Sequence, residues 1–206
     1  MHVDNIKFVN KSPIGLKSYE QYTDWFRKIT PLCQVLVIDD DGFILTESVA
    51  ILKYLAIKYN VPDHWYPRSD LKAQARVDES MNWHHLNTRY SCTLYLELMS
   101  LPILNKAPIQ WHLVEEERNQ VRKAVSSLAS YFLKDNKPFL CGNEISVADL
   151  LCVTEMMQLV TCWEEDLYES NPVIKDWVQR VRERTDPVFQ ESHHIAYRVR
   201  NKFSKQ

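Results

Sequence analysis

The first sixty residues alternate short apolar runs with turn signals, a pattern typical of strands. Residues 35–38 form a β-branched run, VLVI, and residues 43–45 form a second apolar run, FIL. Between them Asp41 and Gly42 make an Asp-Gly pair, which is a strong signal for a tight hairpin turn. A brief apolar stretch also occurs at residues 6–9. The pattern therefore predicts a β-hairpin preceded by a further short β-type run.

Two helices are expected in the same part of the chain. Residues 19–29 fit a modest helix. A second helix should begin after residues 46–48, TES, because apolar residues then recur along one face. That face holds Ile51, Leu52, Leu55 and Tyr59, with Lys53 and Lys58 opposite. The first part of the chain is thus expected to be a small mixed α/β unit that ends in a helix.

The composition changes near residue 60, and helical spacing dominates afterwards. Residues 60–71 contain two prolines and little periodicity, which indicates an inter-domain connector. Between Pro67 and Pro102 there is neither glycine nor proline, which leaves room for one long helix. Apolar residues recur at steps of three or four in three helices. They are Trp83, Leu86, Tyr90 and Leu94 in this helix, Val121, Val125, Leu128 and Phe132 in a second, and Ile174, Trp177 or Val178, and Val181 in a third. A last helix is expected over residues 188–203. The second part is therefore predicted to be an all-α bundle.

One helix start has a specific local signal. Residues 146–149 read SVAD, a capping box in which Ser146 accepts from the amide of Asp149 and the Asp149 carboxylate accepts from the amide of Ser146. Ile145 and Leu150 flank the box as a hydrophobic staple. We interpret the motif as a buried helix start that builds the fold and carries no chemistry. Loss of such a cap costs about 1 kcal/mol.

Composition and charge remove several classes of function. The chain has 206 residues, enough for one large domain or two small ones, and a formal net charge of −2, which provides no electrostatic footprint for nucleic acid or anionic membrane. It has 3 glycines, where average usage would give about 14. This scarcity argues against an all-β fold and against a glycine-rich phosphate loop. No apolar stretch approaches the ~18 residues of a membrane helix, and a signal-peptide pattern is missing.

The cysteines and histidines do not indicate a metal site. The five cysteines are widely spaced and form no CxxC pair, which is typical of reduced thiols in a cytosolic protein. The adjacent pairs His84-His85 and His193-His194 point about 100° apart on a helix, so neither pair can easily ligate one metal ion. Residues 39–41, DDD, are explained by a solvated turn.

Two longer stretches carry a family resemblance. Residues 39–67 read DDDGFILTESVAILKYLAIKYNVPDHWYP, and residues 75–89 read ARVDESMNWHHLNTR. Together with the connector, the bundle and the capped helix NEISVADLL, these stretches resemble the cytosolic glutathione S-transferases. The sequences of the two stretches resemble the theta class in particular. The resemblance implies an α/β plus all-α architecture: an incomplete thioredoxin-like, glutathione-binding domain over residues 1–61, a linker over residues 62–70 and an all-helical C-terminal domain over residues 71–206.

The same resemblance implies an activity and its setting. A theta-type transferase conjugates the thiolate of glutathione to small electrophiles in detoxification. Glutathione is a cosubstrate, and no bound cofactor is expected. The resemblance further implies a cytoplasmic homodimer with no nucleic-acid or membrane partner. The identity of the electrophile is not indicated, because acceptor pockets are built from scattered apolar side chains.

The resemblance also assigns glutathione-binding residues. Ser48 takes the γ-glutamyl carboxylate through its amide and hydroxyl, and Glu47 faces the ammonium, at a helix start whose free amides suit an anion. A polar helix start without a ligand is the alternative. Val35 matches the residue whose backbone pairs with the cysteinyl unit. Gln34 matches a position at the glycine end and Gln21 a position often held by histidine, and a plain surface role is the alternative for both glutamines.

Two interpretations remain for Arg89 in the long helix. It matches an arginine that similar enzymes aim at the thiolate, where a guanidinium lowers the thiol pKa and holds the anion. A salt bridge within the helical bundle explains the residue equally well. Cys33 could form a mixed disulfide with glutathione, but an inert thiol is favoured because no basic neighbour activates it.

The sequence departs from the family pattern in two places. The first strand and helix of the family are missing, together with the serine that donates a hydrogen bond to the thiolate. We therefore expect an open strand edge at residues 35–39. We expect either a poorly stable N-terminal half or a chain that is a truncated isoform or an incomplete gene model.

The second departure replaces the cis Val-Pro peptide of the family by Val35-Leu36. Because a cis bond before a non-proline residue costs about 2.5–4 kcal/mol, we expect a trans bond here. A trans bond would turn the backbone polar groups of Val35 away from glutathione and weaken glutathione binding. Two functions stay open. One is a theta-type transferase whose catalytic activity is impaired in this chain, and the other is a non-catalytic, transferase-like binding or dimerisation module.

Overall fold

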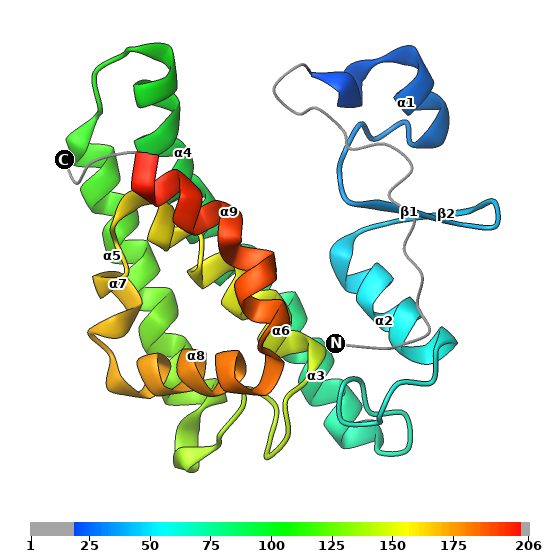
Figure 1. The fold of residues 1–206 in the computed structure, drawn as a ribbon. Coiled ribbons are helices and arrows are strands. Elements are labelled where there is room, and N and C mark those ends of the chain that lie inside the picture. Colours follow the sequence, from blue (N-terminus) through cyan, green and yellow to red (C-terminus); the bar gives the residue numbers. More distant parts are fainter. Residues whose placement is uncertain (1–18, 203–206) are drawn as a thin grey trace. The chain divides into compact units, whose positions relative to one another are not determined.

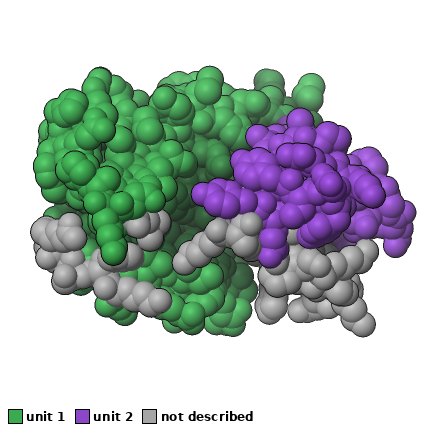
Figure 2. All heavy atoms as spheres, turned by 90° about the horizontal axis from the view of Figure 1, so that it is seen from above, with its two compact units in different colours: residues 1, 63–206 green, residues 2–62 purple. Residues whose placement is uncertain are grey.

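The computed structural model describes residues 19–202 (Figure 1). The apolar stretch at residues 6–9 lies outside the described residues. By packing, the chain divides into two compact units, one ending at Pro62 and one running from Asp63 (Figure 2). Within residues 19–202 no helix combines the length and the apolar character that a membrane crossing needs.

The N-terminal unit, which is unit 2 in Figure 2, contains the predicted hairpin. Its elements are the 3-10 turn η2 (Glu20–Tyr22), α1 (Asp24–Ile29), β1 (Val37–Asp40), β2 (Phe43–Thr46) and α2 (Ser48–Lys58). Strands β1 and β2 pair antiparallel, and Asp41 and Gly42 between them both take positive φ, as a type I′ turn requires. The amide of Gly42 donates to the carboxylate of Asp39 over 2.8 Å. The hairpin is thus confirmed, although β1 begins at Val37, later than the apolar run.

The helix expected over residues 19–29 is interrupted. Thr23 has φ of −71° and ψ of 155°, which is extended backbone. Its hydroxyl donates to the carbonyl of Glu20 over 2.7 Å. A threonine that hydrogen-bonds to nearby backbone competes with helix formation, and the chain therefore forms η2 and α1 as separate short elements.

The helix α2 is confirmed and is tied to the hairpin. It buries Ile51 and Ala56. Near its C-terminal end the hydroxyl of Tyr54 and the ammonium of Lys58 both donate to the carboxylate of Asp40 in β1. These bonds lower the pKa of Asp40, with the Lys58 bond as the largest cause. The position of α2 beside β1 is therefore set by polar contacts as well as by packing.

The C-terminal unit, which is unit 1 in Figure 2, is helical, as predicted (Figure 1). Its elements are α3 (Leu71–His84), η3 (His85–Arg89), α4 (Tyr90–Asn105), α5 (Trp111–Ser127), η4 (Leu128–Phe132), η5 (Lys134–Asn136), α6 (Val147–Met156), η6 (Leu159–Cys162), α7 (Asp166–Glu169), α8 (Pro172–Thr185) and α9 (Val188–Lys202). The core lies among α4, α5, α6 and α8, and Tyr95 and Trp177 are its largest fully buried side chains. The spacing of Val121 and Val125 on α5, and of Ile174 on α8, predicts this core correctly.

The long helix runs through α3, η3 and α4 and continues past Pro102. The element η3 is a π-helical turn. Of the apolar residues that indicated this helix, Leu86 is 81% exposed and Tyr90 is 59% exposed, whereas Trp83 is partly buried and packs against the core. The buried face is formed by Val77, Met81, Cys92 and Tyr95.

The capping box at the start of α6 forms, and Asp149 does more than the motif predicts. The amide and the hydroxyl of Ser146 both donate to the Asp149 carboxylate, each over 2.9 Å. The amide of Leu140 and the indole Nε1 of Trp177 also donate to it, each over 2.9 Å. Asp149 therefore joins the preceding loop, α6 and α8 at one buried point.

His84 at the end of α3 leads to a prediction about acid stability. It is 2% exposed, and neither ring nitrogen has a hydrogen-bond partner among the described residues. Burial lowers its pKa to about 3, and the charges of His85 and Arg89 act in the same direction. In the unfolded chain the ring takes up a proton below about pH 6.5. The native state therefore loses stability as the pH falls from about 6.5 toward 3.

We expect the free energy of unfolding to fall by about 2 kcal/mol more in the wild type than in His84→Gln when the pH is lowered from 7 to 5. Urea titrations of both proteins, followed by circular dichroism at each pH, measure this difference. Equal pH dependence in the two proteins would show that His84 does not carry the effect.

Candidate functional site

The register of the hairpin brings several predicted site residues to one end. In the sheet Val37 lies opposite Thr46. Because the strands are antiparallel, the residues just before Val37 and just after Thr46 are neighbours at the open end of the hairpin. Val35 and Ser48 each lie two positions beyond this pair. The open end therefore places the loop of residues 34–36 beside the start of α2.

The peptide bond between Val35 and Leu36 is cis, so the expected trans bond is wrong. The expectation applied the preference of an isolated non-proline peptide bond, whereas the surrounding fold sets the geometry of this loop. Cys33 in the same loop has a positive φ of 55°, and the Val35 side chain is exposed. The expectation of a misaimed Val35, which rested on a trans bond, therefore loses its basis.

Glu47 and Ser48 form the N-terminal end of α2. Glu47 has φ of 68° and ψ of 112°, a conformation that costs a non-glycine residue about 1–3 kcal/mol and that clusters at functional sites. Its carbonyl accepts the first bond of the helix from the amide of Ile51, over 2.9 Å. The amides of Ser48 and of the next two residues precede this bond, so they have no partner within α2 and can donate to a ligand. The arrangement suits a carboxylate.

The two glutamines are placed differently. Gln34 is exposed in the loop before β1, at the open end of the hairpin with Val35, Glu47 and Ser48. Gln21 lies in η2, and its Oε1 atom is buried without a hydrogen-bond partner among the described residues. A buried amide oxygen normally has a partner. No hydrogen bond between described residues joins Gln21 to the four residues at the open end.

Arg89 at the end of η3 makes the salt bridge that sequence reasoning left as one of two alternatives. Its Nη1 atom donates to Oε1 of Glu155 on α6 over 2.6 Å, and Oε2 of Glu155 accepts from the side-chain Nε2 of Gln158. The Arg89 side chain is 50% exposed and that of Glu155 is 4% exposed. Burial raises the pKa of Glu155, and the charge of Arg89 opposes this rise. One Nη atom of Arg89 is therefore held by Glu155, while about half of the side chain remains accessible.

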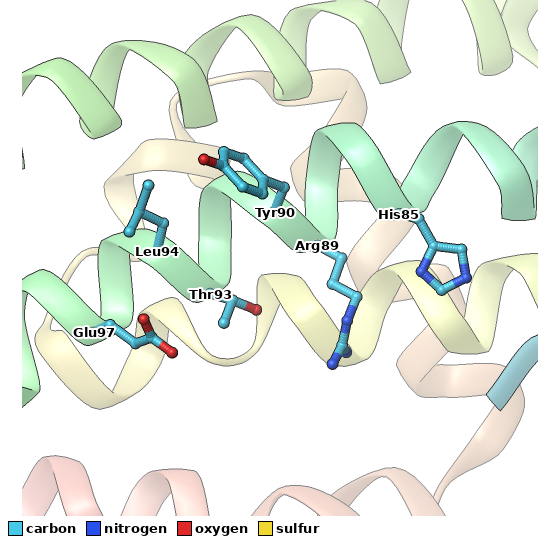
Figure 3. A pocket seen from close by; sticks show the side chains of 6 residues that line it. All are labelled: His85, Arg89, Tyr90, Thr93, Leu94 and Glu97. Atoms are coloured by element: carbon cyan, nitrogen blue, oxygen red, sulfur yellow. The ribbon is translucent and has the colours of Figure 1, made fainter. Parts of the chain in front are cut away.

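The open part of Arg89 faces a pocket on the surface of the long helix. The pocket has a volume of about 260 Å³ and is lined by His85, Arg89, Tyr90, Thr93, Leu94 and Glu97. Figure 3 shows His85, Arg89, Thr93 and Glu97 projecting from one side of the helix, as their spacing of four residues requires. The pocket combines an arginine, a carboxylate and the half-exposed ring of Tyr90. It can hold a small molecule with apolar and anionic parts.

Sequence reasoning missed Glu155 and Gln158 as partners of Arg89. The available signal is the composition of α6, VADLLCVTEM, in which Asp149 and Glu155 are the only charged residues. A carboxylate on an otherwise apolar helix needs a partner when it is buried. That signal predicts a buried ion pair, but it does not identify Arg89 as the cation.

Comparisons with known proteins agree on one family. The family description "Glutathione S-transferase, C-terminal domain" matches residues 92–185. The mouse protein "Glutathione S-transferase theta-3" is 38% identical to this chain over 190 residues, which cover 91% of this chain and 78% of the relative.

Solved structures extend the similarity to three dimensions. The apo form of human glutathione S-transferase T1-1 superposes with a TM-score of 0.82 at 36% identity, covering 90% of this chain and 77% of that chain. Human glutathione transferase theta-2, solved in complex with glutathione, superposes with a TM-score of 0.82 at 36% identity, covering 89% and 74%. On this evidence, the chain belongs to the theta class of the glutathione S-transferase family.

Proposed function

We propose that this chain conjugates the thiolate of glutathione to small electrophiles. The observation that carries the proposal is the open end of the hairpin, where the strained Glu47 and the free amides at the start of α2 lie beside the loop of residues 34–36. Family membership supports it, and the human theta-2 relative was solved in complex with glutathione.

Each residue at the open end receives a role in this proposal. The amide and hydroxyl of Ser48 hold the γ-glutamyl carboxylate, and Glu47 faces the ammonium. The backbone of Val35 pairs with the cysteinyl unit, and Gln34 reaches the glycine end. We assign Gln21 to the same ligand because it matches a position of similar enzymes that is often held by histidine. Glutathione binding thus belongs to the domain that ends at residue 61.

Arg89 is proposed to stabilise the thiolate. A thiol has a reference pKa near 8.5, and lowering it by ~2 units requires about 2.7 kcal/mol of selective stabilisation of the anion. A guanidinium supplies such stabilisation through its fixed charge. The salt bridge with Glu155 does not exhaust this capacity, because one N–H group is engaged there and a guanidinium has five.

We further propose a cytoplasmic homodimer that acts in detoxification, with the helical domain starting at residue 71 after a linker over residues 62–70. The five cysteines are all free thiols, as is typical of proteins from reducing compartments. The proposal that the chain forms a dimer rests only on its family membership.

Calorimetry on the purified chain tests the proposed binding. We expect saturable uptake of glutathione with a dissociation constant of about 1 mM or tighter, in the range of ordinary enzyme substrates. Cysteinylglycine, which lacks the γ-glutamyl carboxylate and ammonium, is the matched control ligand and should bind far more weakly. A folded chain that takes up neither compound, or both equally, would contradict the assignment of Glu47 and Ser48.

A non-catalytic glutathione-binding or dimerisation module is the second candidate. The observation that favours it is the salt bridge of Arg89 with Glu155, which gives the one proposed catalytic residue a structural role as well. A conjugation assay with a generic aromatic electrophile separates the two functions. Turnover that saturates with glutathione supports the transferase, and binding without turnover supports the module.

A further inference from the structure

Arg89 bridges a buried carboxylate and a surface pocket, which is unusual for a simple structural ion pair. The guanidinium contacts Glu155 at one Nη atom, while the side chain lines the pocket with His85 and Thr93. An arginine that is anchored in this way loses less conformational entropy when it contacts a ligand. The anchored geometry therefore favours a defined direction for the free N–H groups.

The anchor is itself fixed. Glu155 lies on α6, where its carboxylate accepts from Arg89 at Oε1 and from Gln158 at Oε2. The side chain of Glu155 is 4% exposed. Both carboxylate oxygens thus have a charged or polar partner, which a buried carboxylate requires.

Stability alone is a weak explanation for this arrangement. Burying a carboxylate costs free energy that the attraction to a half-exposed arginine repays only in part. A packed pair of apolar residues would hold α6 against the long helix at least as well. The pair does, however, set the direction of a functional cation, as partners in a second layer do at other polar sites.

We propose that Glu155, held by Gln158, is a positioning residue that fixes Arg89 in the pocket of the long helix. This inference rests on the proposed function, because it gives Arg89 a role only if the chain is a transferase. Glu155 does not touch the reacting sulfur; it acts through the orientation of Arg89. Gln158 is part of the same arrangement, because it occupies the second oxygen of the carboxylate.

The test compares Glu155→Ala and Glu155→Gln with a matched ion pair in the same unit. Arg118 and Glu164 form such a pair, with side chains 23% and 18% exposed, and neither lines the pocket. We expect Glu155→Ala to lower kcat by about 10- to 100-fold, the size of loss that misplacement of a reacting group produces. The dissociation constant for glutathione should stay unchanged when it is measured at a pH low enough to keep the bound thiol protonated. Glu164→Gln should change the melting temperature and leave kcat unchanged.

The conservative variant sharpens the test. In Glu155→Gln the amide oxygen still accepts from Arg89, and the Gln158 amide can turn to offer its own oxygen to the new NH₂ group. We therefore expect Glu155→Gln to keep most of the kcat that Glu155→Ala loses. Addition of Glu155→Ala to Arg89→Ala should cause no further loss, because the two residues act as one unit.

Three results would overturn the inference. If Glu155→Ala lowers only the melting temperature, as Glu164→Gln does, or if its effect adds fully to that of Arg89→Ala, Glu155 is not a positioning residue and the proposed function stands. If the wild-type chain neither binds glutathione nor turns over, the proposed function fails and the inference fails with it.

Discussion

Replacing Asp149 by alanine is expected to destabilise the helical unit by about 3–5 kcal/mol, the largest effect of any single substitution that we consider. The carboxylate is fully buried and accepts four hydrogen bonds, from the amide and hydroxyl of Ser146, the amide of Leu140 and the indole of Trp177. Alanine leaves all four donors without a partner inside the protein. Each unsatisfied buried donor costs about 1–3 kcal/mol before the structure relaxes.

This loss should exceed that of an ordinary helix cap. Asp70 caps α3 by accepting from the amides of Lys72 and Ala73, over 2.9 and 3.1 Å, in exposed surroundings. Because water can replace this cap, Asp70→Ala should cost about 1 kcal/mol. The comparison separates the capping function, which both aspartates share, from the buried junction that only Asp149 provides.

Urea unfolding followed by far-ultraviolet circular dichroism gives both values, since the helical unit supplies most of the signal. Asp149→Asn should fall between the wild type and Asp149→Ala, because its amide keeps one acceptor oxygen and turns an NH₂ group toward the donors. A loss for Asp149→Ala no larger than that for Asp70→Ala would show that the bonds from Leu140 and Trp177 contribute nothing beyond the cap.

Sequence reasoning succeeds here where the controlling chemistry is local. Asp41-Gly42 defines a turn by backbone conformation alone, and the SVAD motif at residues 146–149 defines a helix start within four residues. Apolar spacing identifies Val121 and Ile174 as core because their helices are regular. The same reasoning misassigns Leu86, which is in helical register with Trp83 but is exposed, because an apolar side chain at helical spacing does not by itself identify the buried face.

The features that sequence reasoning misses depend on contacts between distant segments. Trp177 lies 28 positions from Asp149, and Glu155 lies 66 positions from Arg89, so neither pairing follows from spacing. The cis bond at Val35-Leu36 is set by the surrounding fold. At the candidate site the resemblance supplies the residues, and the hairpin register, with Val37 opposite Thr46, places the two segments that carry them at the same end of the hairpin.

Replacing Ser48 by alanine is expected to weaken glutathione binding by about 10- to 100-fold. The hydroxyl of Ser48 is proposed to donate to the γ-glutamyl carboxylate, and a hydrogen bond to a charged group contributes about 1.5–3 kcal/mol, which corresponds to a loss of this size. The backbone amides at the start of α2 are unaffected, so binding should be weakened and not abolished. Calorimetric titration with glutathione measures the change.

Three comparisons show whether the hydroxyl itself is responsible. Ser48→Thr keeps a hydroxyl and should bind nearly as well as the wild type. Ser130→Ala removes a serine hydroxyl that donates to the carbonyl of Ser126 in the helical unit, and it should leave glutathione binding unchanged. Cysteinylglycine lacks the carboxylate that Ser48 holds, so Ser48→Ala should not weaken its residual binding further.

The size of the loss distinguishes the hydroxyl from the helix end. If the free amides and the dipole of α2 supply nearly all the attraction, Ser48→Ala should lose less than about threefold, the equivalent of a weak neutral hydrogen bond. If the hydroxyl and the amide of Ser48 both donate hydrogen bonds to the carboxylate, the affinity for glutathione should fall tenfold or more. Unchanged binding in Ser48→Ala would place the γ-glutamyl carboxylate elsewhere and would remove the role proposed for the start of α2.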